Sequence, residues 1–235
     1  SVASASAAIA LTRVSLTAPA EVFVISRPGS APRQLTHHND ALLAELDLPS
    51  PEPFWFTGKD GARVQAILLR PPGMPDGRKV PLVVLLHGGP HTTWSDAWSY
   101  RWNPQLFAAP GRAVLIVNRR GSTGYGKEFS DGVIADWGGT AYDDVMTGLD
   151  VALERFAFLD GERVAAAGAS YGGYMANWIA THSGRFKAII SHAGVFEMFA
   201  QYSADIPYFL EHEMGGLPWN AGSFAKWSPA SYSAE

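Results

Sequence analysis

The chain has 235 residues, 47% of them hydrophobic and 17% charged, so it can bury a sizeable core and does not have the composition of a disordered segment. Its formal net charge is -4, and its Lys and Arg residues are scattered along the chain, which argues against nucleic acid as a partner. The absence of cysteine excludes disulfides, thiolate metal sites and a cysteine nucleophile. It leaves the compartment undetermined, cytoplasmic as well as periplasmic or secreted.

The N-terminal part of the chain predicts a small β-structure. Residues 1–11 are small and apolar, like part of a signal peptide, but they have no initiator Met and no charged region. A fragment or a processed chain is the simpler interpretation. Residues 14–35 read as short strands broken by turn residues, with strands over 21–26 and 32–36. No apolar run reaches the roughly 20 residues of a transmembrane helix.

After a polar, proline-bearing connector over residues 41–53, apolar strands alternate with helices. This alternation predicts an α/β fold, with a mostly parallel sheet that is covered on both faces. An amphipathic helix is predicted over residues 141–156, and a second helix begins near Tyr171. The predicted strands cover residues 64–69, 82–86, 113–117, 164–167 and 188–190.

The most specific motif is the G-x-S-x-G of residues 168–172, which directly follows a predicted strand. A strand that turns into a helix within a few residues forces Ser170 into a tight, strained turn, which is a nucleophile elbow. A serine hydroxyl is a weak nucleophile at neutral pH and needs a histidine base, which an acid orients. We predict that Ser170 is the nucleophile of a hydrolase and that the backbone N–H of Tyr171 donates to the oxyanion.

Two further glycine loops follow predicted strands, at His87-Gly88-Gly89-Pro90 and at residues 118–126. Ligands bind at the carboxyl ends of strands in such sheets, so both loops are expected on the same rim as Ser170. In lipases and esterases an H-G-G-G loop supplies backbone donors, but Pro90 has no N–H. This difference weakens an esterase interpretation.

Together these motifs resemble the catalytic domain of the prolyl oligopeptidase family of serine peptidases, which includes dipeptidyl peptidases and acylaminoacyl peptidases. The resemblance implies an incomplete α/β-hydrolase domain over residues 54–235, truncated before the last strands. It also implies that residues 1–40 are the last strands of a preceding β-propeller and that residues 41–53 are a connector. Within the family, Ser170 would be the nucleophile and Tyr125, in the R-G-x-x-x-Y-G loop, a side-chain oxyanion donor.

The resemblance also suggests substrate contacts. An apolar pocket for the residue before the scissile bond would be lined by Val195, Phe196, Phe199 and Tyr202. Aromatic residues at helical spacing are equally typical of a core. Glu211 and Glu213 resemble an acidic segment that holds a free substrate amine in some dipeptidyl peptidases, whereas a charged turn is usually only solvated.

The acid and base of a triad are not evident in the chain. In an α/β-hydrolase they follow the serine in the order Asp or Glu, then His, so we expect His87 to brace its loop. The histidines and the aspartate that follow Ser170 are His182, His192, His212 and Asp205. None is convincing. By resemblance, residues 227–232 precede the strand that leads to the catalytic aspartate, so both groups are expected beyond Glu235.

The predicted function is therefore a serine peptidase that hydrolyses short peptides through an acyl-enzyme on Ser170, with no cofactor and no metal. It would need the C-terminal segment and the propeller, and a sheet that is cut there should associate, so an oligomer is an option. Two alternatives stay open: an inactive fragment or assembly module without the triad Asp and His, and a carboxylesterase. Dipeptidyl, acylaminoacyl and endo-oligopeptidase specificities are not distinguished.

Overall fold

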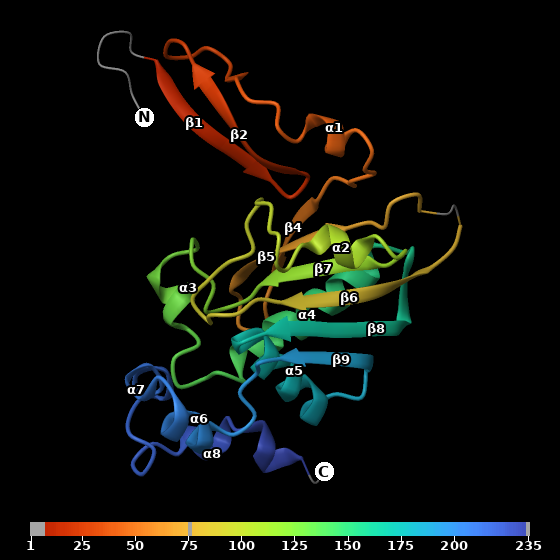
Figure 1. The fold of residues 1–235 in the computed structure, drawn as a ribbon. Coiled ribbons are helices and arrows are strands. Elements are labelled where there is room, and N and C mark those ends of the chain that lie inside the picture. Colours follow the sequence, from red (N-terminus) through yellow and green to blue (C-terminus); the bar gives the residue numbers. More distant parts are fainter. Residues whose placement is uncertain (1–7, 75–76, 234–235) are drawn as a thin grey trace.

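The structure is a computed structural model that describes residues 8–74 and 77–233 (Figure 1). Most of the signal-peptide-like stretch therefore lies outside the described residues, and its last part lies in a strand. Among the described residues, no helix is long and apolar enough to span a membrane.

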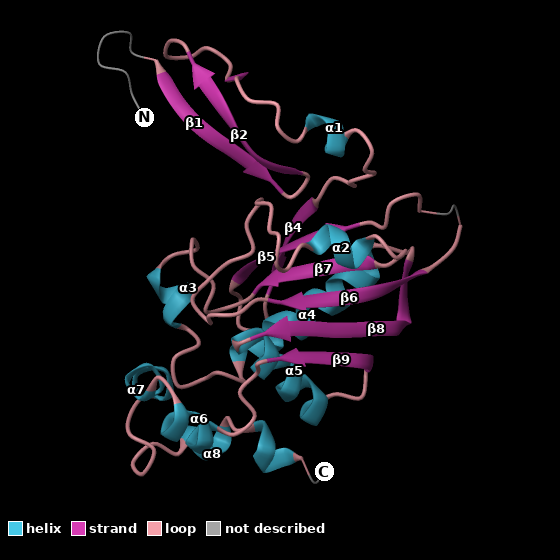
Figure 2. Cartoon of the chain, in the orientation of Figure 1, coloured by secondary structure: helices cyan, strands magenta, loops and turns pink. Residues whose placement is uncertain are grey.

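The main body is a mixed β-sheet with the strand order β4-β5-β7-β6-β8-β9. Strands β7, β6, β8 and β9 are mutually parallel and point the same way (Figure 2), whereas β5 pairs antiparallel with β7 and β4 pairs antiparallel with β5. The predicted strands are confirmed, and β4 adds one that the connector prediction missed. The strands are β4 (Glu52–Thr57), β5 (Arg63–Leu69), β6 (Val80–Leu86), β7 (Ala113–Asn118), β8 (Leu159–Ala169) and β9 (Phe186–His192).

Two apolar clusters cover the two faces of this sheet because side chains alternate along each strand. Leu68 belongs to the larger cluster, while its neighbours Ile67 and Leu69 belong to the smaller one. The larger cluster packs against α4 (Thr140–Arg155) and α5 (Tyr171–His182), which confirms the two predicted helices. The smaller cluster packs against α2 (Pro104–Ala108).

Beside α2, the smaller face is partly open. A groove of about 350 Å³ lies over β6, β8 and β9, and Ile190 on its floor is 56% exposed. Its rim carries Arg112, Arg163 and Lys187. An apolar floor with an exposed isoleucine is a surface that would gain free energy by being covered.

The N-terminal piece is a separate three-stranded antiparallel sheet of β1 (Ile9–Ser15), β2 (Ala18–Ile25) and β3 (Arg33–Gln34), followed by α1 (Asp40–Leu43). Figure 1 shows it projecting from the β4 end of the main sheet. Its β1–β2 turn is the point of contact: Leu16 is 1% exposed and belongs to the smaller cluster. The Leu16 N–H also donates to Oδ1 of Asp96 at 2.7 Å.

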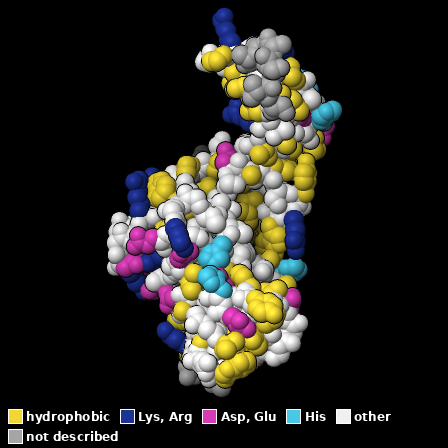
Figure 3. Space-filling model, turned by 90° about the vertical axis from the view of Figure 1, so that its left-hand side faces the viewer, with side chains coloured by type: hydrophobic (Ala, Val, Ile, Leu, Met, Phe, Trp, Pro, Cys, Tyr) yellow, Lys and Arg dark blue, Asp and Glu magenta, His cyan; other side chains and the backbone are white. Residues whose placement is uncertain are grey.

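The carboxyl ends of the parallel strands form one rim, which faces the viewer in Figure 3. Hydrophobic side chains gather toward the end of this face where the C-terminal helices lie, and Lys and Arg form no continuous patch on it. The remaining elements are α3 (Lys127–Asp131), α6 (Met198–Ala204), α7 (Pro207–Met214), α8 (Ser223–Lys226) and the 3-10 helix η1 (Pro229–Tyr232).

Candidate active site

Ser170 lies in the turn between β8 and α5, with its backbone at φ 57 and ψ -122. Its N–H donates to the carbonyl of His192 at 3.0 Å, and its own carbonyl accepts from the N–H of Tyr174 at 2.8 Å. The side chain is exposed at the rim. This is the strand–turn–helix geometry of a nucleophile elbow, in which a strained backbone presents the hydroxyl outward.

The glycines on both sides make this turn possible. A Cβ on Gly168 would lie 2.3 Å from the carbonyl oxygen of Gly172, and a Cβ on Gly172 would lie 2.1 Å from the carbonyl oxygen of Leu86. Backbone atoms cannot retreat from such overlaps without moving β6 or α5. Only glycine therefore fits at either position.

Two backbone segments border the Ser170 hydroxyl. The N–H of Tyr171 opens α5, where the first N–H groups of a helix have no intrahelical acceptor. On the other side runs the loop after β6, because a Cβ on Gly88 would lie 3.9 Å from Oγ of Ser170. Ser170 and Gly88 line the same cavity of about 270 Å³, together with Trp94, Arg101 and Trp102.

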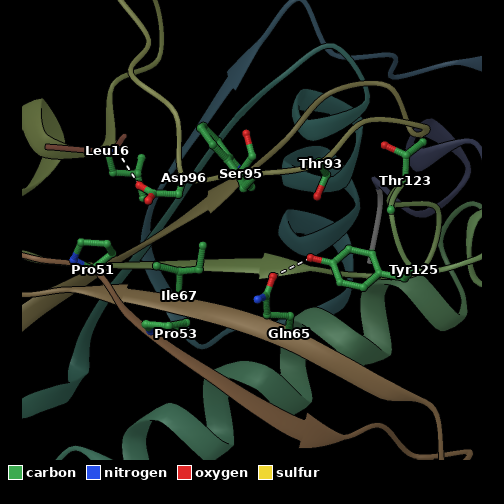
Figure 4. A pocket seen from close by; sticks show the side chains of 12 residues that line it. Leu16, Pro51, Pro53, Gln65, Ile67, Thr93, Ser95, Asp96, Thr123 and Tyr125 are labelled. Carbon is green, nitrogen blue, oxygen red and sulfur yellow. Dashed lines mark hydrogen bonds between the residues drawn. The ribbon is translucent and has the colours of Figure 1, made fainter. Parts of the chain in front are cut away.

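Tyr125 lies in a neighbouring cavity of about 590 Å³ (Figure 4). Its hydroxyl donates to Oε1 of Gln65 at 2.5 Å and accepts from Nδ2 of Asn118 at 2.8 Å. Thr93 and Trp94 line both cavities, but Ser170 lines only the smaller one. The structure thus brings Tyr171 and Ser170 together and leaves the Tyr125 hydroxyl committed to Gln65.

His87 is buried and both of its ring nitrogens are occupied. Nδ1 donates to the carbonyl of Gly88 at 2.7 Å, and Nε2 accepts from the hydroxyl of Ser122 at 2.8 Å. Burial, and secondarily the charge of Arg119, hold the pKa of His87 well below its usual range. A neutral imidazole with both nitrogens engaged braces the loop, as the sequence predicts.

Two buried arginines follow β7, and the sequence does not single out either one. Arg120 is held by the buried carboxylate of Asp144, to which its Nη2 donates at 2.8 Å. Arg119 is 1% exposed and makes no ion pair with a carboxylate within residues 8–74 and 77–233. Instead its guanidinium carbon lies 4.1 Å from the ring centroid of Tyr171.

The four predicted pocket residues divide into two kinds. Phe196 and Phe199 are 47% and 42% exposed, whereas Val195 and Tyr202 pack partly against the larger cluster. The rings of Phe199 and Tyr202 both contact Phe224, at centroid distances of 5.5 and 5.7 Å. The set therefore combines packing residues with aromatic surface beside the rim.

The two predicted acidic residues on α7 have different surroundings. Glu211 is partly exposed, and its Oε1 accepts from the Tyr202 hydroxyl at 2.8 Å. The Glu213 side chain is completely buried and accepts from Nε2 of His91 at 2.9 Å and from Nε1 of Trp137 at 2.8 Å. Both oxygens of Glu213 are thus committed within the protein, while Glu211 faces solvent.

The later histidines lie in settings unlike that of a triad base. His182 stacks on Trp178 with ring centroids 3.9 Å apart, and its Nδ1 lies 3.0 Å from the Trp178 carbonyl. His212 is exposed on α7. Although the carbonyl of His192 holds the elbow, none of the three pairs with a carboxylate in the part of the chain that the structure describes. The same residues contain no cluster of potential metal ligands.

Comparison with solved structures identifies the fold. The chain superposes on "Acylaminoacyl peptidase in complex with Z-Gly-Gly-Phe-chloromethyl ketone" with a TM-score of 0.88 and 31% identity, over 96% of this chain and 36% of that one. An acylaminoacyl peptidase of Pyrococcus horikoshii gives a TM-score of 0.87 and 30% identity, over 95% and 36% of the two chains. The architecture is therefore the α/β-hydrolase fold.

Sequence comparison gives the family. The model of the prolyl oligopeptidase family matches residues 98–235, more than half of the chain, and the chain belongs to this family. It is 41% identical over 202 residues to dipeptidyl-peptidase 5 of Schizosaccharomyces pombe, covering 83% of this chain and 30% of that protein. For dipeptidyl-peptidase 5 of Aspergillus oryzae the values are 39% over 181 residues, 76% and 25%. The chain thus spans less than a third of the length of these relatives.

Proposed function

We propose that this chain carries the nucleophile and the oxyanion site of a serine peptidase that hydrolyses short peptides through an acyl-enzyme on Ser170. The single observation that carries the proposal is the elbow, in which a strained, exposed serine opens α5 between two glycines that admit no Cβ. Membership of the prolyl oligopeptidase family and likeness to dipeptidyl and acylaminoacyl peptidases support peptides as the substrate class.

In the proposed reaction, Oγ of Ser170 forms a bond to the scissile carbonyl carbon and its proton passes to the general base. The negative charge that develops on the carbonyl oxygen needs donors fixed in advance. We assign this role to the N–H groups of Tyr171 and Gly88, since both residues border the hydroxyl. The C–N bond then breaks, the amine leaves with the proton from the base, and water hydrolyses the remaining ester.

Tyr125 remains a candidate for a further donor. Its hydroxyl would have to leave Gln65 before it could point at an oxyanion. The variant Tyr125→Phe tests whether the Tyr125 hydroxyl is an oxyanion donor or whether the two backbone N–H groups act alone. A loss of kcat of about a hundredfold would support the hydroxyl as a donor, and an unchanged kcat would leave the role to the two backbone groups.

We propose that the acid and the base of the triad come from residues outside this chain. The settings of His182, His192 and His212 support this, because none of them pairs with a carboxylate among the described residues. On the same reasoning, residues 1–40 would be the end of a propeller and residues 41–53 the connector to the catalytic domain. Their assignment rests on resemblance and on the separate sheet that β1, β2 and β3 form.

For the substrate, we propose that the exposed rings of Phe196 and Phe199 contact the residue before the scissile bond, with Val195 and Tyr202 supporting them. Glu211 is the better placed of the two acidic residues for a free substrate amine, because Glu213 has no exposed oxygen. The variant Glu211→Gln should then raise KM for substrates with a free amino terminus and leave N-blocked substrates unchanged.

The deciding experiment uses the complete protein that contains this chain. A fluorophosphonate probe should label Ser170, and Ser170→Ala should abolish both the label and the hydrolysis of aminoacyl and dipeptidyl amides. An unlabelled but correctly folded protein would refute the proposal. Hydrolysis by the 235-residue chain alone, lost in Ser170→Ala, would rule out the alternative of an inactive assembly module. Hydrolysis of simple esters without detectable hydrolysis of peptide amides would favour an esterase.

A further inference from the structure

We propose that Arg119 is a positioning residue that fixes the two backbone donors beside Ser170 and polarises that of Gly88. The inference rests on the proposed function, because it concerns the oxyanion of the acylation step. Neither the G-x-S-x-G motif nor the residues next to Arg119 in the sequence suggest such a role for it.

The first contact is with the peptide group that contains one of the donors. Nη2 of Arg119 donates to the carbonyl oxygen of His87 at 3.2 Å. That carbonyl and the N–H of Gly88 belong to the same planar peptide unit. A cation on the oxygen fixes the plane of the unit and draws electron density from the nitrogen, so the Gly88 N–H becomes a stronger donor.

The second contact is with the residue that carries the other donor. The guanidinium lies over the face of the Tyr171 ring, 4.1 Å from its centroid. The Tyr171 hydroxyl donates to the carbonyl of Trp137 at 2.5 Å, which anchors the far end of the ring. The side chain is therefore held at both ends, and with it the start of α5, where the Tyr171 N–H lies next to the nucleophile.

The position of the guanidinium is built into the loop after β7. Nη1 donates to the carbonyl of Arg120 at 2.9 Å, and a Cβ on Gly121 would lie only 2.9 Å from that nitrogen. Gly121 has φ +94, a conformation that other residues rarely adopt. The absence of a Cβ at Gly121 thus leaves room for the guanidinium of Arg119.

The charge of Arg119 is not neutralised by a partner. The nearby buried carboxylate of Asp144 accepts from the N–H, Nε and Nη2 of Arg120, and carbonyl oxygens accept from Arg119. An arginine stays protonated even where burial lowers its pKa. A fixed cation in contact with the His87–Gly88 peptide unit and the Tyr171 ring, screened little by water, lowers the energy of the oxyanion more than that of the neutral substrate.

The test uses Arg119→Met and Arg119→Lys in the complete enzyme, with Arg163→Met as the matched control. Arg163 is an exposed arginine in the first half of β8 that pairs with Asp160. For each variant we would measure kcat, KM, the thermal unfolding midpoint and two inhibition constants. One inhibitor is a peptide aldehyde, which forms a tetrahedral adduct with Ser170, and the other is the corresponding peptide amide, which does not.

We expect Arg119→Met to lower kcat and aldehyde affinity by about ten- to hundredfold, with KM and amide affinity within about twofold of wild type. Arg119→Lys, which keeps the charge, should recover part of the loss, and Arg163→Met should change nothing. An equal loss of aldehyde and amide binding would overturn the inference, as would an unchanged kcat.

If Arg119→Met does not fold, the ratio of the two inhibition constants in Arg119→Lys decides. Failure of the proposed function is distinct, because the wild type would then neither turn over nor bind the aldehyde more tightly than the amide.

Discussion

Nε2 of His91 donates to Oε1 of Glu213 across 2.9 Å, and this bond joins the loop after β6 to α7. The Glu213 side chain is completely buried, and its second oxygen accepts from Nε1 of Trp137. The sequence suggests that Glu213 contacts a substrate amine, but in the structure its carboxylate holds the loop after β6 against α7 and Trp137. Its position would matter for the proposed catalysis because the loop after β6 also holds Gly88 beside Ser170.

Removing this carboxylate should destabilise the fold without a selective effect on substrates. In Glu213→Ala the buried Nε1 of Trp137 and the partly exposed Nε2 of His91 lose their acceptor, so we expect the free energy of unfolding to fall by about 3 kcal/mol. Glu213→Gln retains one carbonyl acceptor and should lose less. Urea unfolding measures both effects. A variant that kept its stability but raised KM only for substrates with a free amine would contradict this role.

A methyl group at position 172 should prevent the elbow from forming. A Cβ there would lie 2.1 Å from the carbonyl oxygen of Leu86, while a Cβ on the control Gly184 would meet nothing within 4 Å. We expect Gly172→Ala to cost more than about 3 kcal/mol and to lose fluorophosphonate labelling, and Gly184→Ala to stay within about 1 kcal/mol of wild type. Full labelling of Gly172→Ala would show that the turn has more freedom than its contacts indicate.

At position 170, glycine should give a more stable protein than alanine, although neither variant is active. Its φ of 57 with ψ -122 costs a side chain free energy that glycine does not pay. Both Ser170→Ala and Ser170→Gly remove the hydroxyl, but only glycine relieves the backbone. We expect Ser170→Gly to be more stable than Ser170→Ala by about 1 kcal/mol in denaturant unfolding. Equal stability of the two would mean that the turn stores no strain.

The sequence predicts the elbow and the strands because their signals are local. Glycines next to a serine after an apolar run permit few backbone conformations, and the core strands read as continuous apolar segments. By contrast, β4 carries Pro53 and pairs as an edge strand, so it looks like a connector. The burial of Glu213 depends on His91, which is 122 positions away in the chain. Such a partner cannot be read from a charged turn alone.

The contacts of Arg119 were missed for a related reason. Its partners are the carbonyl of His87 and the ring of Tyr171, which lie on two other strand-end loops. The sequence places these loops on one rim but does not say which of the two adjacent arginines contacts the elbow. Asp144 decides this, since it holds Arg120 and leaves Arg119 to the elbow.

The stability of the fold should fall below about pH 6.5 because of His87. Burial keeps the pKa of this residue well below its ordinary value of 6.5, so the native state stays unprotonated where the unfolded chain takes up a proton. His87 therefore lowers the free energy of unfolding by up to about 1.4 kcal/mol per pH unit, from 6.5 down to its native pKa. Urea unfolding across this range should show a shallower slope in His87→Gln than in the control His212→Gln. Identical slopes would contradict the assignment.

The open groove over β8 and β9 should make the isolated 235-residue chain associate. Strand β9 has an unpaired edge among the described residues, and Ile190 beside it is 56% exposed. Exposed apolar surface beside a free strand edge favours pairing between copies.

We expect sedimentation velocity to show oligomers that Ile190→Lys shifts toward monomer, because a charge there is costly to cover. Tyr208→Lys is the control, since Tyr208 is 84% exposed on α7, away from the groove. If Tyr208→Lys dissociated the oligomers and Ile190→Lys did not, the interface would lie at the C-terminal helices instead.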